Sequence, residues 1–146
     1  MPLNIRVSID GLRENRRELD RIRRRISDTA PFWRSVAVPI IKGKLRDIFL
    51  QEGPGWDPLA ESTLLTRRYP GLPILEQTGD LKASLLDHPV LQITRNELLF
   101  GTNNPYAPFH EHGTRRMPAR PFLQPALEEA MNEIRNRYAD YIRNQI

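Results

Sequence analysis

The stretch Asn104–Leu123, NPYAPFHEHGTRRMPARPFL, concentrates turn-forming, aromatic and rigid residues in one short segment. It opens with Asn104-Pro105, directly after Asn103, and this combination is typical of a turn. Arg120 lies directly before Pro121 and two residues after Pro118, so we expect a stiff, extended chain that fixes the direction of the guanidinium. This suits a bidentate pair with a carboxylate, of the same chain or of a neighbouring one. Side chains alternate along an extended chain, which predicts Pro118, Arg120 and Phe122 on a common side, with Phe122 buried.

The segment leads into a long C-terminal helix and follows a short hairpin. Pro121 to Leu123 enters the helix, with Pro125 expected at its first position. The apolar residues at helical spacing, expected to form its buried stripe, are Leu127, Met131, Ile134, Tyr138 and Tyr141. Upstream, Val90–Thr94 and Glu97–Gly101 are rich in β-branched and apolar residues on either side of Arg95-Asn96, which predicts a β-hairpin.

The first half of the chain is predicted to be a strand followed by helices. The residues that alternate with polar neighbours, and would line one face of the strand, are Leu3, Ile5, Val7 and Ile9. Asp10 can cap the helix that follows. A second helix begins near Pro31, and Pro39 within it cannot donate a backbone hydrogen bond, so we expect a kink or a break there.

The central region is predicted to hold two short helices. Asp57-Pro58 is a helix-start pair, and we expect a helix from Pro58 to about Thr66. Arg67–Pro73 is expected to be a mobile loop that could serve as a contact arm. Thr78 is predicted to cap another short helix that runs through Leu86.

Length and composition narrow the class of protein. The chain has 146 residues and no internal repeat, which fits one domain, residues 1–146. The expected fold is α+β: an N-terminal strand and helices, a small antiparallel sheet with a proline-rich loop, and a long C-terminal helix. Cysteine is absent, which suits a reducing compartment such as a bacterial cytoplasm. We expect neither export nor membrane insertion, because the sequence shows no signal-peptide pattern and no apolar run of about 18 residues.

Three groups of residues, in one order along the chain, resemble the signature of the phage virion morphogenesis proteins, the tail completion or neck proteins of tailed bacteriophages. The first group is Trp56-Asp57-Pro58-Leu59-Ala60-Glu61-Ser62-Thr63. The second is Ile74-Leu75-Glu76-Gln77-Thr78-Gly79-Asp80-Leu81, followed by Ser84. The third comprises Tyr106-Ala107, His110, Gly113 and Pro118-Ala119-Arg120-Pro121-Phe122-Leu123. The residues to which the resemblance points as structural or interface positions are Trp56, Pro58, Leu59, Gly79, Leu81, Tyr106, His110, Gly113, Pro118, Arg120, Pro121 and Phe122.

This resemblance implies a structural virion protein that completes the phage tail or joins the tail to the head. It implies a homo-oligomeric ring around the DNA channel, with sixfold symmetry, that binds the tail tube and the neck or connector proteins. The expected location is the virion, and the host cytoplasm during assembly. We expect no enzymatic activity, no cofactor and no contact with a membrane. Contact with DNA in the channel is possible in such a ring.

The residues themselves offer little for catalysis. His110-Glu111-His112 is the one cluster that could hold a metal, because alternate residues of an extended segment face the same side. No third ligand and no HExxH pattern accompanies it, so we predict no metal site and expect His110 to stabilise a turn beside Gly113 through a hydrogen bond. A metal-dependent hydrolase that uses His110 and His112 is the third and weakest alternative function. The sequence contains neither a GxSxG nucleophile motif nor a glycine-rich nucleotide-binding loop.

The first predicted helix is rich in arginine. Its cations are Arg13, Arg16, Arg17, Arg21, Arg23, Arg24 and Arg25. They could contact nucleic acid phosphates, which makes a basic nucleic-acid-binding module the alternative function. They could instead form ion pairs on a solvated face, such as Glu14 with Arg17 and Asp20 with Arg24, and we favour this interpretation. Contact with an acidic neighbouring subunit is a third possibility.

Overall fold

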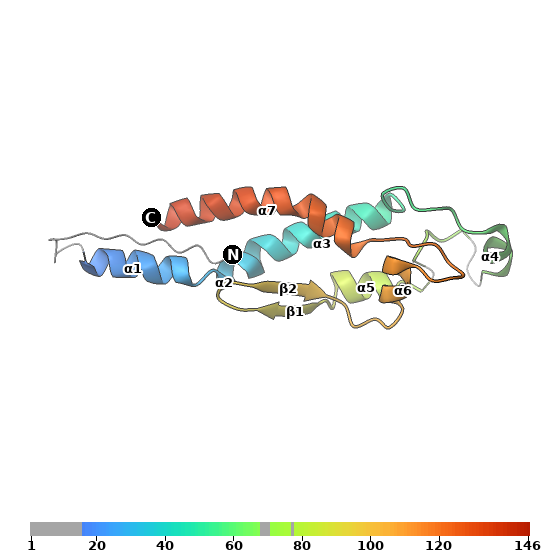
Figure 1. Ribbon diagram of the computed structural model, residues 1–146, viewed down its shortest axis with the longest axis horizontal. Helices are drawn as coiled ribbons and strands as arrows, with labels where there is room; N and C mark the ends of the chain where they lie inside the picture. The colour runs from blue at the N-terminus through green and yellow to red at the C-terminus, as the bar shows by residue number, and fades with distance from the viewer. Residues whose placement is uncertain (1–15, 68–70, 77) are drawn as a thin grey trace.

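Two long helices, α3 (Val38–Leu50) and α7 (Leu123–Gln145), form the centre of the structure, a computed structural model that describes residues 16–67, 71–76 and 78–146. The other elements, in chain order, are α1 (Arg16–Ser27), α2 (Ala30–Phe32), the π-helical segment η1 (Trp33–Ala37), α4 (Glu61–Thr66), α5 (Asp80–Leu86), β1 (Val90–Ile93), β2 (Leu98–Gly101) and α6 (Ala107–His112). The molecule is elongated, with α1 and the C-terminus at one end and α4 at the other (Figure 1). The predicted α+β class is confirmed.

The core lies where α3 packs against α7. Ile41, Leu45 and Ile48 recur at a spacing of three and four residues, which places them on one face of α3, and all three are buried. The buried residues of α7 are Ala126 and Ala130, each with 0% of its surface exposed. Because alanine has a small side chain, the two helix backbones can approach each other closely.

The sequence therefore predicted the wrong residues as the most buried ones of α7. Leu127 lies at the margin of the core, and Met131 is 42% exposed. Tyr138 and Tyr141 are half-buried and pack on Phe32, with ring centroids 5.2 and 5.4 Å from its own. The two buried alanines did not stand out in the sequence because their side chains carry little apolar surface.

The helix does not break at Pro39. The chain is helical throughout from Ala30 to Leu50, and the irregularity is η1, which lies just before this proline. The backbone N–H of Val38 donates to the carbonyl of Trp33, five residues back, instead of four. Pro39 cannot donate a backbone hydrogen bond, and the helix accommodates it with one wider turn instead of a break.

The predicted hairpin is confirmed, and it is tied to the start of the helical half. β1 and β2 pair in antiparallel register, with Leu91 opposite Phe100, and Phe100 is buried. Thr29, between α1 and α2, donates its backbone N–H to the carbonyl of Arg95 in the hairpin turn at 2.7 Å, and its hydroxyl donates to the same oxygen. This contact fixes the hairpin against the junction of the first helices.

Both short central helices begin later than the sequence suggested. α4 begins at Glu61 and not at Pro58. α5 begins at Asp80, and its N-cap residue is Gly79, in a left-handed conformation with φ of 77°. The hydroxyl of Thr78 still accepts a hydrogen bond from the backbone N–H of Asp80, at 3.4 Å. Thr78 thus makes the predicted contact with the start of the helix, but the N-cap position itself lies one residue later, at Gly79.

Several predictions fall on residues that the structure does not describe. They include the strand of residues 3–9, the Asp10 cap, the Glu14–Arg17 pair and the tip of the central loop at residues 68–70. Within the described ranges, no helix is both long and apolar enough to cross a bilayer.

Candidate functional site

The segment of residues 104–123, named here the signature segment, folds back on itself. It forms α6 and turns at Gly113, and the returning chain pairs with the helix: the backbone N–H of Arg120 donates to the carbonyl of His110 at 2.7 Å. Gly113 has φ of 75°, and a Cβ atom at this position would lie 2.7 Å from the backbone nitrogen of Ala119. Only glycine fits such a close return of the chain.

Arg120 is buried but is not paired with a carboxylate. It is 6% exposed, its Nε donates to the carbonyl of Asp57 at 3.0 Å, and its Nη2 donates to the carbonyl of Pro58 at 3.2 Å. Within the chain, carbonyls take the place of the predicted carboxylate, and the two-pronged geometry is present. These two carbonyls precede α4, and the guanidinium binds them where the chain is not yet helical.

Trp56 links the same region to the core. Its indole Nε1 donates to the carbonyl of Pro121 at 2.7 Å. Its ring lies edge-on to Phe49, with centroids 6.2 Å apart, and Phe49 in turn packs on Phe122 at 6.0 Å. A Cβ atom on Gly53 would lie 1.9 Å from the indole, so this glycine leaves the space in which the tryptophan packs. The predicted burial of Phe122 is confirmed, with 1% of its surface exposed.

Glu111 is the residue of this site whose role the sequence did not reveal. Its carboxylate accepts backbone hydrogen bonds from Phe122 at 2.9 Å, Leu123 at 3.1 Å and Gln124 at 2.9 Å. These donors are the unpaired N–H groups at the start of α7, where a negative charge is also favoured by the helix dipole. The helix begins at Leu123, earlier than the predicted start at Pro125. The acid lies eleven or more residues before its donors, too far for any local capping pattern to identify it.

The two neighbouring histidines cannot share a metal ion as proposed for an extended chain. They lie on α6, where residues two positions apart point to different sides of the helix. Burial, together with the positive charge of Arg120, lowers the pKa of His110. His112 is exposed. No group of three metal-binding side chains occurs within residues 16–67, 71–76 and 78–146.

The structure brings most of the predicted site residues together. We call one cluster of residues the Arg120 junction. It consists of Trp56, Asp57, Pro58, His110, Glu111, Gly113, Arg120, Pro121 and Phe122. Leu81 joins the same core from α5, and Gly79 starts that helix. Leu59 is half-buried, whereas Pro118 and Tyr106 are exposed. Pro118 therefore does not share the buried side of Arg120 and Phe122.

Comparison with known proteins identifies the family to which the chain belongs. Residues 10–145 match the sequence model of the phage virion morphogenesis family. The chain belongs to this family. It is also 28% identical over 126 residues to the "Mu-like prophage FluMu G protein 2" of Haemophilus influenzae, an alignment that covers 82% of this chain and 83% of the relative. No solved structure matches the chain. The resemblance seen in the sequence is confirmed, and the protein has a structural role in phage virion morphogenesis.

This family member exposes apolar side chains on two short helices far from α1. We name these side chains the apolar end: Leu64 and Leu65 of α4, and Tyr106 and Phe109 at α6. Leu65 is 80% exposed and Tyr106 is 66% exposed. Both helices lie in the half of the molecule opposite the C-terminus (Figure 1). Contiguous apolar patches, unlike single exposed side chains, mark surfaces that contact other molecules.

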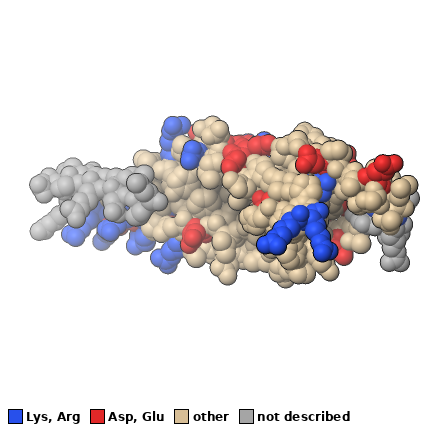
Figure 2. Space-filling view, turned by 45° about the vertical axis from the view of Figure 1, so that its right-hand side comes forward, with Lys and Arg blue, Asp and Glu red and all other residues tan. Residues whose placement is uncertain are grey.

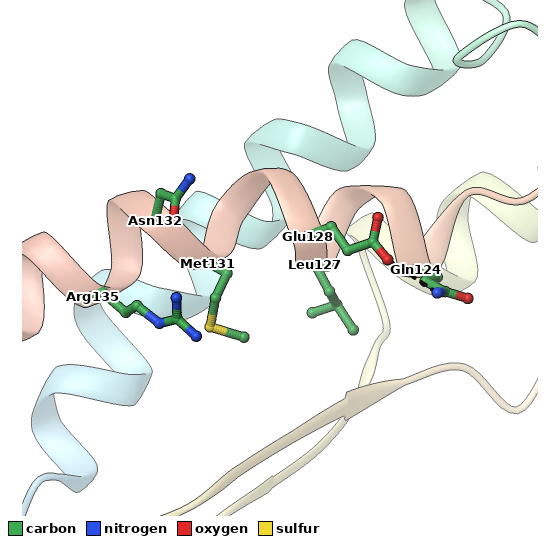
Figure 3. A pocket seen from close by; sticks show the side chains of 6 residues that line it. All are labelled: Gln124, Leu127, Glu128, Met131, Asn132 and Arg135. Atoms are coloured by element: carbon green, nitrogen blue, oxygen red, sulfur yellow. Dashed lines mark hydrogen bonds between the residues drawn. The ribbon is translucent and has the colours of Figure 1, made fainter.

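A shallow hollow on α7 of this family member lacks the convergent polar groups that a ligand site needs. It has a volume of about 300 Å³ and is lined by Gln124, Leu127, Glu128, Met131, Asn132 and Arg135. All six residues belong to α7, and Figure 3 shows their side chains spread along the helix without a common focus. Ligand sites normally need polar groups from several elements that converge on one point.

Proposed function

We propose that this member of the phage virion morphogenesis family completes the phage tail or joins the tail to the head, as one copy of a hexameric ring. Its partners in this proposal are the tail tube and the neck or connector proteins. The protein is then found in the virion, and in the host cytoplasm during assembly. It acts by docking and not by catalysis.

The observation that supports this proposal most directly is the rigid mounting of α6. Its carbonyl at His110 accepts from Arg120, and its side chain at Glu111 holds the start of α7. The Arg120 side chain in turn donates hydrogen bonds to two backbone carbonyls that precede α4. The helix is thus fixed from both sides, and little conformational entropy is lost when it binds a partner.

The exposed side of the same helix supplies the contact surface. Tyr106 and Phe109 are three residues apart and share one side of the helix start. Phe109 is 52% exposed. Aromatic side chains on a rigid support are typical of the residues that carry most of the binding energy of protein interfaces. The apolar end therefore fits a docking surface for another virion protein.

Phage assembly provides the test. Phe109→Ala is compared with Leu99→Ala, because Leu99 is 51% exposed on the hairpin and both changes remove a similarly exposed apolar side chain. We expect Phe109→Ala to leave the melting temperature unchanged and to lower the yield of completed particles about tenfold or more, whereas Leu99→Ala assembles like the parent. Equal yields for the two variants would contradict docking through α6.

A second measurement addresses the ring itself. Light scattering is expected to find the free protein as a monomer or a mixture of oligomers, and electron microscopy of assembled particles should show it as a ring at the tail end or neck. Absence of the protein from both purified virions and assembly intermediates would refute the proposal.

A further inference from the structure

The positive charge of this protein is concentrated on α1. The helix carries six arginines and two carboxylates, a net charge of +4, which equals that of the whole chain. The remaining residues hold 16 basic and 16 acidic side chains and are neutral in sum. Figure 2 shows Lys and Arg side chains along the lower edge of the end that holds α1. The net charge of the chain thus equals that of one short helix.

The helix presents two unlike faces. Leu19, Ile22 and Ile26 lie on one side and are half-buried, and α1 contacts α7. Helical spacing places Arg17, Arg21 and Arg24 on the opposite side, and all three are exposed. Apolar packing therefore holds the helix to the body while a row of guanidinium groups faces outward.

The recorded ion pairing does not neutralise this row. Arg21 contacts Glu18 at 3.5 Å, but both side chains are more than 60% exposed, and such a pair is weak in water. Asp20 and Arg24, expected to pair, are not joined by a salt bridge in the structure. The sequence-based preference for an ion-paired, solvated face is thus not supported for Asp20 and Arg24.

The composition of the outward face separates two kinds of partner. Protein interfaces have an apolar centre with aromatic residues, and the outward face of α1 has no apolar side chain. Interfaces with nucleic acid are more polar and strongly positive, and arginine donates a planar pair of hydrogen bonds that matches a phosphate. We propose that α1 binds the phosphate backbone of duplex DNA, independently of base sequence, through Arg17, Arg21 and Arg24. This inference does not rest on the proposed ring.

Fluorescence anisotropy with the full-length protein and a labelled duplex of mixed sequence tests the proposal. Three phosphate contacts give a slope of about −2.7 for the logarithm of the association constant against the logarithm of salt concentration, or a loss on the order of 40-fold between about 50 and 200 mM salt. Changing Arg17, Arg21 and Arg24 together to glutamine should abolish most of this dependence. The matched control changes the exposed Arg115 and Arg116 together with Arg135 to glutamine and removes the same charge outside α1.

Further variants make the outcome decisive. Changing the three α1 arginines to lysine keeps the charge, so it should retain the salt slope and most of the affinity. Circular dichroism is expected to show all variants folded, because the changed side chains are exposed. The proposal is overturned if the parent does not bind at about 50 mM salt, if the control weakens binding as much as the α1 variant, or if poly-glutamate binds as tightly as the duplex. The last result would point to an acidic protein partner.

Discussion

Replacement of Arg120 by lysine tests whether the Arg120 junction depends on the fork of the guanidinium or only on its charge. Arginine donates from two nitrogens to two different carbonyls, those of Asp57 and Pro58, at 3.0 and 3.2 Å. Lysine keeps the charge but offers a single nitrogen, so we expect it to hold only one of these acceptors well. A hydrogen bond to a charged group contributes about 1.5–3 kcal/mol. We therefore expect Arg120→Lys to lower the free energy of unfolding by about 2 kcal/mol.

For a chain of this length, that loss lowers the melting temperature by about 4–8 °C. Equilibrium unfolding in urea gives the free energy directly, and an unchanged m-value would show that the compactness of both states is unaltered. Arg116→Lys, at an exposed position, is the control and should match the parent. Particle assembly should also fall with Arg120→Lys, because this junction supports α6. If stability and assembly both remain at the parent level, the two-pronged contact contributes nothing and the reasoning is refuted.

Three other substitutions probe the same region. Phe122→Ala should lower the free energy of unfolding, measured in urea, by about 3–5 kcal/mol, because it empties a fully buried site. A decrease below about 1 kcal/mol would mean that the core closes over the gap. Glu111→Gln should lower the free energy of unfolding by about 2–4 kcal/mol, because it removes the charge that three backbone N–H groups share at the start of α7. Glu129→Gln, at an exposed position of α7, should match the parent, and an equal effect of both changes would argue against the cap. The lowered pKa of His110 means that the unfolded chain binds more protons than the folded one below the ordinary histidine pKa of about 6.5. Stability should therefore fall as the pH drops from about 7 to 5, and more steeply in the parent than in His110→Gln, as urea unfolding at several pH values would show; identical slopes in the two proteins would contradict this assignment.

Local pattern was sufficient for much of this fold. The spacing of Ile41, Leu45 and Ile48 predicts the buried face of α3, and a run of β-branched and apolar residues predicts the hairpin, because each signal depends on neighbours within one or two turns of the chain. The order of motif residues was sufficient to identify the family as well. The burial of Phe122 was also predicted correctly, although the alternation on which that prediction rested failed at Pro118.

Contacts between distant residues decided what the sequence did not reveal. The partners of Arg120 are carbonyls more than sixty residues away, and an arginine alone does not distinguish a carbonyl acceptor from a carboxylate. Glu111 caps a helix only because the turn at Gly113 returns the chain beside it. α4 begins after Pro58, whose carbonyl accepts a hydrogen bond from Arg120, so the local helix signal did not decide the start of this helix. The sequence by itself thus determined the family, the hairpin and most of the helices, since these depend on periodicity and motif order. It did not predict α6, where an extended chain was expected, and the site was decided by the folded chain, since its bonds join segments that only tertiary structure brings together.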